Sequence, residues 1–297
     1  MGTDAPVGTD APVGIDSVRA VRVAITADEA ELAADALWQA GAAAIEEQPG
    51  ALVAATADGG DPARLLAAVA HRWPAEAIAV DLDGALDAWR AHARAVVVGD
   101  RLVVRPPWVA RENAGRSGDA PPDGALDVVV DPGRAFGHGA HPSTRLVLDA
   151  LVDAVRGGER VLDVGCGSGV LAIAALAFGA RTAVGIDVDP AAIAATRANA
   201  ARNGVADRVI VVAAVDDPAT AGRYDLVVAN MLASQLLAVA PTVAGAVAPG
   251  GTVLLSGLLA AQREQVLGAY GSDQPTRLAV VGEREDEGWL CLTLRAG

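Results

Sequence analysis

The second half of the chain alternates between short apolar runs and segments in which apolar residues follow helical spacing. Runs rich in valine, isoleucine and leucine predict strands at 160–164, 182–187, 208–213, 224–229 and 252–256. Segments with a period near 3.6 predict helices before and between them, at about 144–155, 168–178, 190–203, 232–247 and 260–270. This alternation is typical of an α/β fold in which a parallel sheet carries helices on both faces. Two further strands near the end of the chain should add an antiparallel hairpin to that sheet.

The first part of the chain predicts a smaller, separate α+β domain. Over residues 18–83 the pattern reads strand, helix, two strands, helix and strand. This βαββαβ order is the ferredoxin-like plan, which hosts many functions and identifies none. Residues 1–17 contain a TDAPVG repeat and are predicted to form a disordered tail. Residues 84–124 are predicted as a linker, and 125–297 as the larger domain with a Rossmann-like sheet.

Composition narrows the class of protein. With 297 residues, of which 52% are hydrophobic, the chain is long enough for two domains and a sizeable core. The sequence contains no apolar run long enough to span a bilayer, and its start lacks the pattern of a secretory signal. Cys166 and Cys291 do not indicate a disulfide framework, which favours a reducing cytoplasm.

The chain is strongly acidic, with a net charge of −14, and all 23 of its basic residues are arginines. Direct binding of naked nucleic acid is not expected, because phosphate groups require a positive surface. A basic protein partner fits this charge better. Residues 18–83 hold 4 Arg and 11 acidic residues, a net charge of −7, which would suit such a partner. A surface that is acidic only for solubility explains the charge equally well.

The sequence VLDVGCGSG at 161–169 is the most informative motif. An apolar strand ends there, a glycine-rich turn follows, and a helix begins. Gly165, Gly167 and Gly169 permit positive φ and let the backbone approach a ligand closely. Asp187 ends the next predicted strand, twenty residues after Gly167, where a carboxylate can bind both hydroxyls of a ribose. The spacing departs from GxGxxG, so a dinucleotide is the weaker interpretation, and an ordinary strand-to-helix turn is the structural alternative.

Two other residues in this half have a functional and a structural interpretation. Asn230 ends the strand RYDLVVAN, at the edge where open α/β sheets bind ligands. Its carbonyl could accept a hydrogen bond from an amine and direct the nitrogen lone pair, or Asn230 could simply cap the next helix. Cys166 is better explained as a small residue that fills the turn than as a nucleophile.

The segment DPGRAFGHGAHPST at 131–144 is too rich in Gly and Pro for regular structure. Phe136, one of only two Phe residues, suits a lid whose aromatic ring packs against a ligand. Thr144 opens the following helix and is expected both to cap it and to face the ligand. His138 and His141 lack the Cys or carboxylate pattern of a metal site, so no metal is expected.

Four segments together resemble the ribosomal protein L11 methyltransferases, class I S-adenosylmethionine-dependent enzymes that methylate protein eleven of the bacterial large ribosomal subunit. The segments are DPGRAFGHGAHPSTR, VLDVGCGSGVLAIAALAFGA, GIDVDPAAIAATRANAARNGV and DLVVANMLASQLLAVAP. They occur in the family's order and spacing, and the resemblance runs from about Val18 to the C-terminus. It implies a ferredoxin-like domain that recognises the substrate, a linker, and a class I catalytic domain that binds S-adenosylmethionine.

The resemblance also implies a reaction and a set of site residues. The family trimethylates lysine side chains and the terminal α-amine. Its cofactor contacts fall on Thr144, Gly165, Asp187 and Asn230, and its lid includes Phe136. The family's lid usually reads FGTGTHPTT, whereas His138 and Ala140 replace two threonines here. Two hydroxyl groups near the cofactor are therefore missing from this chain.

Methyl transfer from a sulfonium depends mainly on positioning. Holding the amine and the methyl group in line can lower the activation free energy of the transfer by ~7–11 kcal/mol. A lysine with a pKa of ~10.4 must lose its proton first, and desolvation beside the cationic sulfonium lowers that pKa. The sequence offers no obvious dedicated base. Asp163, beneath the turn that contains Gly167, is expected to bind turn amides or the methionine ammonium of the cofactor.

Two other functions stay open at this stage. The chain could methylate another protein or a small-molecule amine, or it could bind S-adenosylmethionine without catalysis. The intact Gly165, Gly167, Asp187 and Asn230 argue against a non-catalytic module. We expect a cytoplasmic monomer whose partner is the ribosomal protein, without direct contact to nucleic acid or membrane.

Overall fold

The computed structural model divides the chain into two compact units, Met1–His92 and Ala93–Gly297. It describes residues 17–26, 29–42, 44–48, 50–56, 61–81, 93–115, 120–131, 139–214, 217, 220–271 and 276–297. Phe136, His138 and the predicted tail up to residue 16 lie outside the described residues.

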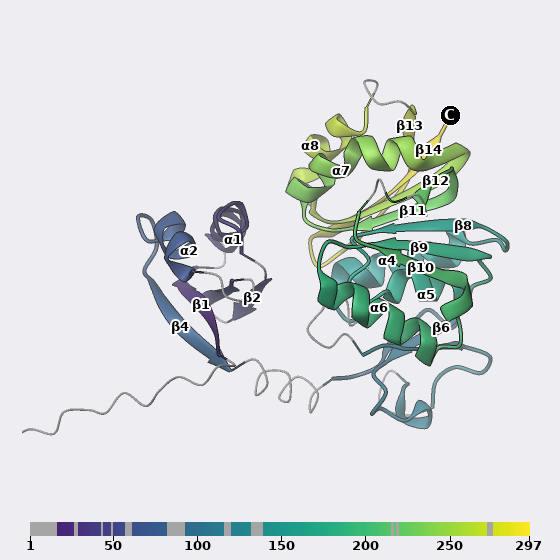
Figure 1. The fold of residues 1–297 in the computed structure, drawn as a ribbon, viewed down its shortest axis with the longest axis horizontal. Helices are drawn as coiled ribbons and strands as arrows, with labels where there is room; N and C mark the ends of the chain where they lie inside the picture. The colour runs from purple at the N-terminus through teal and green to yellow at the C-terminus, as the bar shows by residue number, and fades with distance from the viewer. Residues whose placement is uncertain are drawn as a thin grey trace, which may run out of the picture. The chain divides into compact units, whose positions relative to one another are not determined.

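The described residues of the first unit form a four-stranded antiparallel sheet and two helices (Figure 1). Its elements are β1 (Ser17–Ala24), α1 (Ala30–Gln39), β2 (Ala44–Gln48), β3 (Ala51–Ala55), α2 (Pro62–Val69) and β4 (Ala75–Asp81). The strands are arranged in the order β2-β3-β1-β4. This is the βαββαβ sequence of elements that the hydrophobic pattern predicts, and its designation as a ferredoxin-like fold stays a prediction.

Apolar side chains from the sheet and both helices form the core of the first unit. Val21 of β1, Leu37 of α1 and Leu65 of α2 are fully or almost fully buried in this cluster. Asp61 caps α2 by accepting a hydrogen bond of 2.9 Å from a backbone amide in its first turn. Pro62 is the first residue of the helix, where its missing N–H leaves no hydrogen bond unmade.

The second unit is built on a seven-stranded sheet in the order β10-β9-β8-β11-β12-β14-β13. Its strands are β8 (Arg160–Val164), β9 (Thr182–Ile186), β10 (Val209–Val212), β11 (Tyr224–Asn230), β12 (Val247–Leu259), β13 (Leu278–Asp286) and β14 (Trp289–Ala296). The strands from β8 to β12 pair in parallel. The terminal hairpin of β13 and β14 joins antiparallel. The predicted parallel sheet with an antiparallel hairpin is confirmed.

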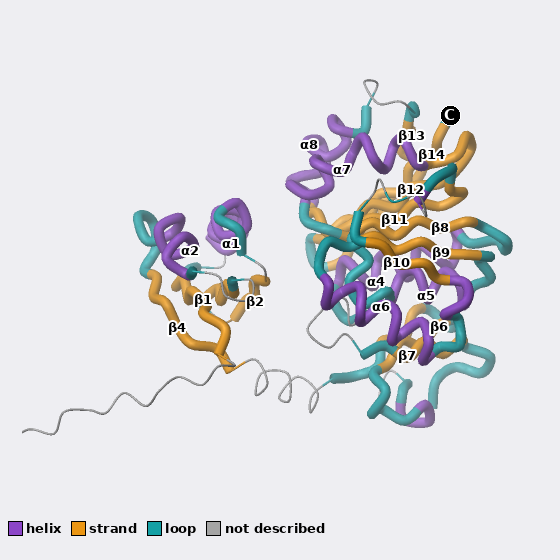
Figure 2. The backbone as a smooth tube through the Cα atoms, viewed as in Figure 1, coloured by secondary structure: helices purple, strands orange, loops and turns teal. Residues whose placement is uncertain are grey.

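Helices cover both faces of this sheet, as Figures 1 and 2 show. One face carries α4 (Pro142–Ala154), α5 (Val170–Ala177) and α6 (Pro190–Arg202), and the other carries α7 (Ala233–Ala246) and α8 (Arg263–Ala269). Leu226 and Val228 of β11 join the core on the first face, whereas Val227 and Ala229 join the core on the second. This alternation follows from the two-residue period of a strand. None of the helices in the described residues is long and apolar enough to cross a bilayer.

A small sheet packs against the helices of the second unit. It consists of β5 (Val96–Val98), β6 (Leu102–Arg105) and β7 (Leu126–Val129), in that order. Val98, Val104 and Val128 are buried in the same core as α4 and α5. β5 and β6 pair as an antiparallel hairpin, yet they lie within 84–124, the segment predicted as a linker. The compact second unit thus begins at Ala93, well before 125.

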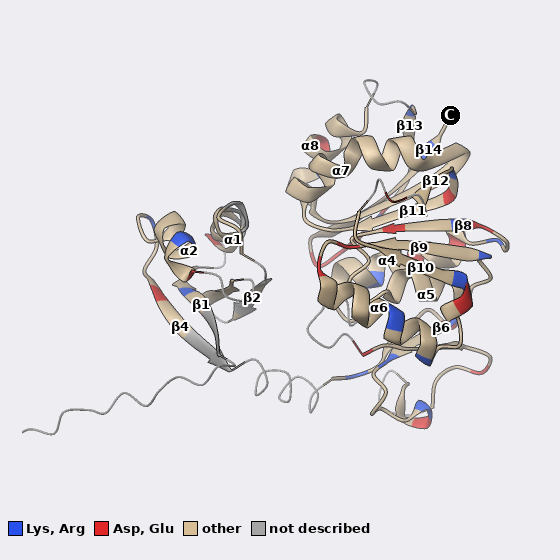
Figure 3. Cartoon of the chain, viewed as in Figure 1, with Lys and Arg blue, Asp and Glu red and all other residues tan. Residues whose placement is uncertain are grey.

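Ion pairs connect the C-terminal hairpin to α4. Arg284 of β13 contacts Asp153 of α4 at 2.7 Å. Arg145 of α4 pairs with Asp286 and Glu287 at the turn of the hairpin. Each partly exposed pair contributes at most about 1 kcal/mol. In Figure 3, basic and acidic positions are interspersed over the described parts of the second unit. Each of these ion pairs is therefore a contact between individual side chains and not part of a large surface of one charge.

Candidate active site

The predicted site residues meet at the carboxyl ends of three neighbouring strands. β8 lies between β9 and β11 in the sheet. The glycine-rich turn follows β8, Asp187 follows β9, and Asn230 is the last residue of β11. The chain leaves β8 toward β9 on one side and returns as β11 on the other, so the strand order reverses here. Open α/β sheets bind ligands at such a point.

The glycine-rich turn is closely packed from two sides. Gly165 and Gly169 have φ values of 74° and 80°, which L side chains rarely adopt. A Cβ added at Gly165 would lie 2.4 Å from the Cε of Met231, and one at Gly169 would lie 2.7 Å from the Cγ2 of Thr196. The second contact is the more demanding one, because Thr196 is short and completely buried. Glycine at these positions therefore shapes the turn.

Asp187 binds the glycine-rich turn directly. Its Oδ2 accepts a hydrogen bond of 2.8 Å from the amide of Gly167, and its Oδ1 accepts one of 3.0 Å from the amide of Asp189. Each carboxylate oxygen can accept more than one hydrogen bond. The half-buried side chain can therefore hold the turn and still accept hydroxyl groups from a ligand.

Asp163 lies beneath the turn and is completely buried. Its Oδ2 accepts a hydrogen bond of 3.2 Å from the amide of Ala172, so the amide it holds belongs to α5 and not to the turn. No described residue forms a hydrogen bond with its Oδ1. Burial, together with the charge of Asp187, raises the pKa of Asp163 to about 7. A cation placed beside Oδ1 would complete this site.

Cys166 fills space within the turn. It is buried, and its Sγ lies 3.5 Å from the hydroxyl of Thr196. Burial raises the pKa of its thiol, which disfavours the nucleophilic thiolate. A Cβ at the neighbouring Gly185 would lie 2.9 Å from the same sulfur. The structure thus favours the prediction that Cys166 is a small filler.

Asn230 and Thr144 come together from positions 86 residues apart. The Asn230 side-chain nitrogen Nδ2 donates a hydrogen bond of 3.1 Å to the Thr144 hydroxyl. Thr144 is almost fully buried, and Asn230 is partly exposed. The residue that precedes α7 in the capping position is Leu232, so the alternative of Asn230 as a helix cap is wrong. With Nδ2 committed to Thr144, the carbonyl Oδ1 of Asn230 can accept a hydrogen bond from an amine.

His141, and not Thr144, caps α4. The side chain of His141 accepts a hydrogen bond of 3.3 Å from the amide of Ser143, and Thr144 is already the third residue of the helix. The predicted capping role of Thr144 is therefore wrong. The His141 ring also packs edge-on against Trp289, with 4.8 Å between ring centroids. Within the described residues no group of His, Cys, Asp and Glu could hold a metal ion.

Ser256 is a site-supporting residue that the sequence analysis did not identify. Its buried hydroxyl lies 3.1 Å from the carbonyl of Ser143 and 2.8 Å from that of Leu290. Its own carbonyl accepts a hydrogen bond of 3.0 Å from the amide of Met231. Ser256 thus connects the start of α4, the hairpin and the end of β11. The signal in the sequence is a lone polar residue inside the apolar run TVLLSGLL.

Known proteins share this fold and sequence. The family described as Ribosomal protein L11 methyltransferase matches residues 68–297. The Ribosomal protein L11 methyltransferase of Symbiobacterium thermophilum is 42% identical over 78% of this chain and 68% of that protein. The one from Ralstonia pickettii is 36% identical over 90% of this chain and 95% of that protein.

A solved structure agrees with this relationship. The ribosomal protein L11 methylase from Lactobacillus delbrueckii subsp. bulgaricus superposes with a TM-score of 0.57 at 26% identity. The match covers 68% of this chain and 96% of that chain. Family and fold agree, and S-adenosylmethionine is the cofactor of such enzymes. The chain belongs to the ribosomal protein L11 methyltransferase family and is an S-adenosylmethionine-dependent methyltransferase.

Proposed function

We propose that this chain methylates lysine side chains and the N-terminal α-amine of ribosomal protein L11, with Asn230 aligning the amine. The observation that carries the proposal is the position of Asn230 at the end of β11, beside the glycine-rich turn, with its Nδ2 bound to Thr144. That bond orients the amide so that Oδ1 is the group offered to a substrate. An acceptor at this place suits a neutral amine, which donates N–H groups and carries one lone pair.

The residues of the site fit S-adenosylmethionine. Asp187 is placed to accept the ribose hydroxyls, and the backbone around Gly165 and Gly167 allows close approach of the ligand. The unpartnered Oδ1 of Asp163 suits the ammonium of the methionine part. Val188, 85% exposed beside Asp187, offers an apolar contact for the adenine base. When bound, the cofactor supplies an electrophilic methyl group.

The protein's own contribution is alignment and removal of water. Asn230 Oδ1 accepts one N–H of the amine, which fixes the direction of the nitrogen lone pair. An amide cannot take up a proton, so Asn230 does not act as the base. The amine has an ordinary pKa of ~10.4 and must arrive neutral, and desolvation next to a positive charge lowers that pKa. Correct alignment alone can lower the activation free energy of methyl transfer by ~7–11 kcal/mol.

The first unit is proposed as the part that recognises the protein substrate. Its net charge between residues 18 and 83 is −7, which complements a basic, lysine-bearing protein. Phe136, in the segment that leads to α4, is proposed to cover the cofactor because the family resemblance places the lid there. We further propose that the enzyme works as a cytoplasmic monomer and contacts the protein and not nucleic acid.

A labelling experiment tests this function. The enzyme is incubated with methyl-labelled S-adenosylmethionine and undermethylated large ribosomal subunits, and the labelled product is identified by mass spectrometry. Label on lysines and on the terminal amine of ribosomal protein L11 is expected. Label on another protein, on RNA or on a small amine would contradict the proposed substrate. Binding of the cofactor without any transfer would favour a non-catalytic module.

A further inference from the structure

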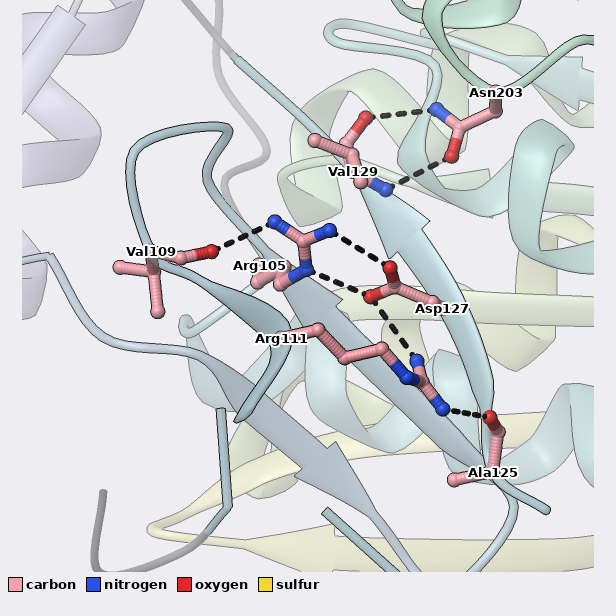
Figure 4. Close-up of polar contacts among 7 residues, drawn as sticks. All are labelled: Arg105, Val109, Arg111, Ala125, Asp127, Val129 and Asn203. Atoms are coloured by element: carbon pink, nitrogen blue, oxygen red, sulfur yellow. Dashed lines mark hydrogen bonds and ion pairs between the residues drawn. The ribbon is translucent and has the colours of Figure 1, made fainter. Parts of the chain in front are cut away.

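Asn199 of α6 and Asn203, which caps the end of that helix, bind the free edge of β7 and the backbone that directly follows it. Asn203 accepts a hydrogen bond of 2.8 Å from the amide of Val129 and donates one of 2.7 Å to its carbonyl, as Figure 4 shows. Asn199 makes the same pair of bonds with Asp131, at 3.0 and 2.9 Å. The amide of Val130, which lies between Val129 and Asp131 in the chain, donates its hydrogen bond to the carbonyl of Arg105 on β6 instead. We call Asn199 and Asn203 the asparagine pair.

The spacing of the asparagine pair matches the strand. Four residues of an α-helix advance by about 6.0 Å, and two residues of a strand advance by about 6.6 Å. Side chains at positions i and i+4 of α6 can therefore bind positions j and j+2 of an extended chain, as a neighbouring strand would. The opposite edge of β7 is held by β6, where Arg105 binds Asp127 through two hydrogen bonds of 2.9 and 2.8 Å (Figure 4).

Asn199 differs from Asn203 because it also reaches the glycine-rich turn. Its Nδ2 donates a second hydrogen bond of 2.9 Å to the carbonyl of Ser168. One turn earlier on α6, the Thr196 hydroxyl donates a hydrogen bond of 2.8 Å to the carbonyl of Gly167. Asn199 and Thr196 are both completely buried. Asn203 binds the backbone of Val129 and of Asn199 and makes no such bond to the turn.

We propose that Asn199, assisted by Thr196, is a positioning residue for the cofactor, because it fixes the glycine-rich turn against β7. The inference rests on the proposed cofactor site and deepens it. Thr196 and Asn199 of α6 donate hydrogen bonds to two successive carbonyls of the turn, those of Gly167 and Ser168. From the other side, Asp187 accepts a hydrogen bond from the Gly167 amide. Without these bonds the turn keeps its glycines but gains alternative backbone conformations. Only one of these backbone conformations can bind the cofactor. Because a smaller fraction of the protein then has that conformation, the apparent affinity for the cofactor falls.

The test compares two substitutions that remove a hydrogen bond to the turn with one at the end of α6 that does not. Asn199→Asp keeps the size and the acceptor oxygen but loses both donated bonds. Thr196→Val keeps the shape and loses the hydroxyl. Asn203→Ala breaks the bonds to β7 without touching the turn and serves as the control. Binding of S-adenosylhomocysteine is measured by calorimetry, and thermal stability is measured on the same samples.

We expect Asn199→Asp to raise the Kd for S-adenosylhomocysteine at least about 10-fold and Thr196→Val to raise it about 3- to 10-fold. Asn203→Ala should change the Kd less than about twofold, even where it lowers the melting temperature as much as Thr196→Val. The KM for S-adenosylmethionine should rise in the two turn variants, with kcat changed less. Exchange of the amides at 166–170 should accelerate in those variants and not in Asn203→Ala.

Equal Kd values for wild type and both turn variants would overturn the inference, as would an equal loss of affinity in Asn203→Ala. If Asn199→Asp does not fold, Thr196→Val decides the question alone, because a threonine-to-valine change introduces no buried charge. Wild-type protein that binds S-adenosylhomocysteine but methylates no ribosomal protein would contradict the proposed substrate and leave the role of Asn199 in place.

Discussion

At the scale of single residues, the site consists of short polar side chains that each serve two partners. Asp187 holds the glycine-rich turn through Gly167 and keeps acceptor capacity for a ligand. Asn230 is oriented by Thr144, and its carbonyl is the group proposed to accept the amine. Such side chains are rigid because one partner belongs to the protein. Changing one of them should therefore affect both the local backbone and the ligand.

Asp187→Ala should weaken S-adenosylmethionine binding by ~2–4 kcal/mol, because two charge-assisted hydrogen bonds to the ribose are lost. Calorimetric titration of the purified variant measures this change. Asp189→Ala is the matched control: Asp189 caps α6 through the Ala191 amide at 2.8 Å, so the variant should lose ~1 kcal/mol of stability but keep its affinity. Unchanged affinity in Asp187→Ala would remove Asp187 from the cofactor site.

Asn230→Ala should lower kcat by the equivalent of ~2–4 kcal/mol and should affect cofactor affinity less than kcat. The lost acceptor matters most when the amine is aligned for transfer. The variant should fold, because α7 is capped at Leu232 and not at Asn230. Thr144→Val should produce a smaller decrease, since only the orientation of Asn230 is lost. Steady-state kinetics with the protein substrate separate kcat from KM. Normal turnover in Asn230→Ala would mean that another group aligns the amine.

Asp163 should give the protein a measurable pH dependence of stability. Burial raises its pKa to about 7, from an ordinary value of 3.8, so the folded state binds this proton more tightly than the unfolded chain. The free energy of unfolding should therefore fall as pH rises through this interval, by up to about 1.4 kcal/mol per pH unit.

Asp163→Asn keeps an oxygen for the Ala172 amide and cannot ionise, so it should flatten this dependence. Melting temperatures of both proteins, recorded without cofactor across the interval, provide the measurement. An equally steep decrease in the Asn variant would show that another group causes it.

At the scale of elements, the end of β11 is set by its close approach to β12. Met231 donates its amide to Ser256, and Gly257 follows with a φ of 84°. A Cβ at Gly257 would lie 2.4 Å from the carbonyl oxygen of Met231, which is backbone and cannot rotate away. Asn230 and Ser256 are the last paired residues of β11 and β12, and the register between β12 and β14 shifts between Ser256 and Leu258. The position of Asn230 depends on this contact.

Gly257→Ala should therefore lower both stability and turnover. The positive φ alone costs ~1–3 kcal/mol, and displacement of Met231 moves Asn230 as well. Gly250→Ala separates the two effects, because Gly250 has a φ of 71° but nothing within 4 Å of an added Cβ. We expect Gly250→Ala to lose stability while keeping kcat. Denaturant unfolding and steady-state kinetics measure the difference, and similar kcat values for the two variants would contradict the role of this contact.

At the scale of the whole molecule, the chain separates into a first unit up to His92 and a second unit from Ala93. The second unit contains the complete candidate cofactor site. It also contains β5 and β6, whose residues Val98 and Leu102 are buried in its core. Residues 93–124, expected from composition to belong to a linker, are thus part of the second unit.

A chain truncated to 93–297 should fold and bind S-adenosylhomocysteine, but it should not methylate ribosomal protein L11. A chain truncated to 125–297 should be unstable, because it lacks β5 and β6 and exposes the apolar face that they cover. Circular dichroism, calorimetry and the labelling assay compare the two. Methylation by 93–297 at the full-length rate would show that the first unit does not recognise the substrate.

The sequence by itself determined the features that depend on neighbouring residues. The spacing of apolar residues along the sequence predicted the α/β order of the second unit and the βαββαβ order of the first. The glycine-rich turn and Asp187 were found because a strand, a turn and a helix follow one another directly, and the next strand lies beside them. Asn230 was found because parallel strands end at the same edge of the sheet.

Only the tertiary structure decided which distant residues form hydrogen bonds with one another. His141 takes the capping position expected for Thr144, Asp163 binds a helix amide and not a turn amide, and Ser256 contacts Ser143 across 113 positions. Asn199 likewise connects the carbonyl of Ser168 to that of Asp131, which precedes Asn199 by 68 positions in the chain. Any asparagine or serine can form a hydrogen bond. Which group it binds is set by the packing of helices against strands, because most buried polar groups must find a partner near their final position.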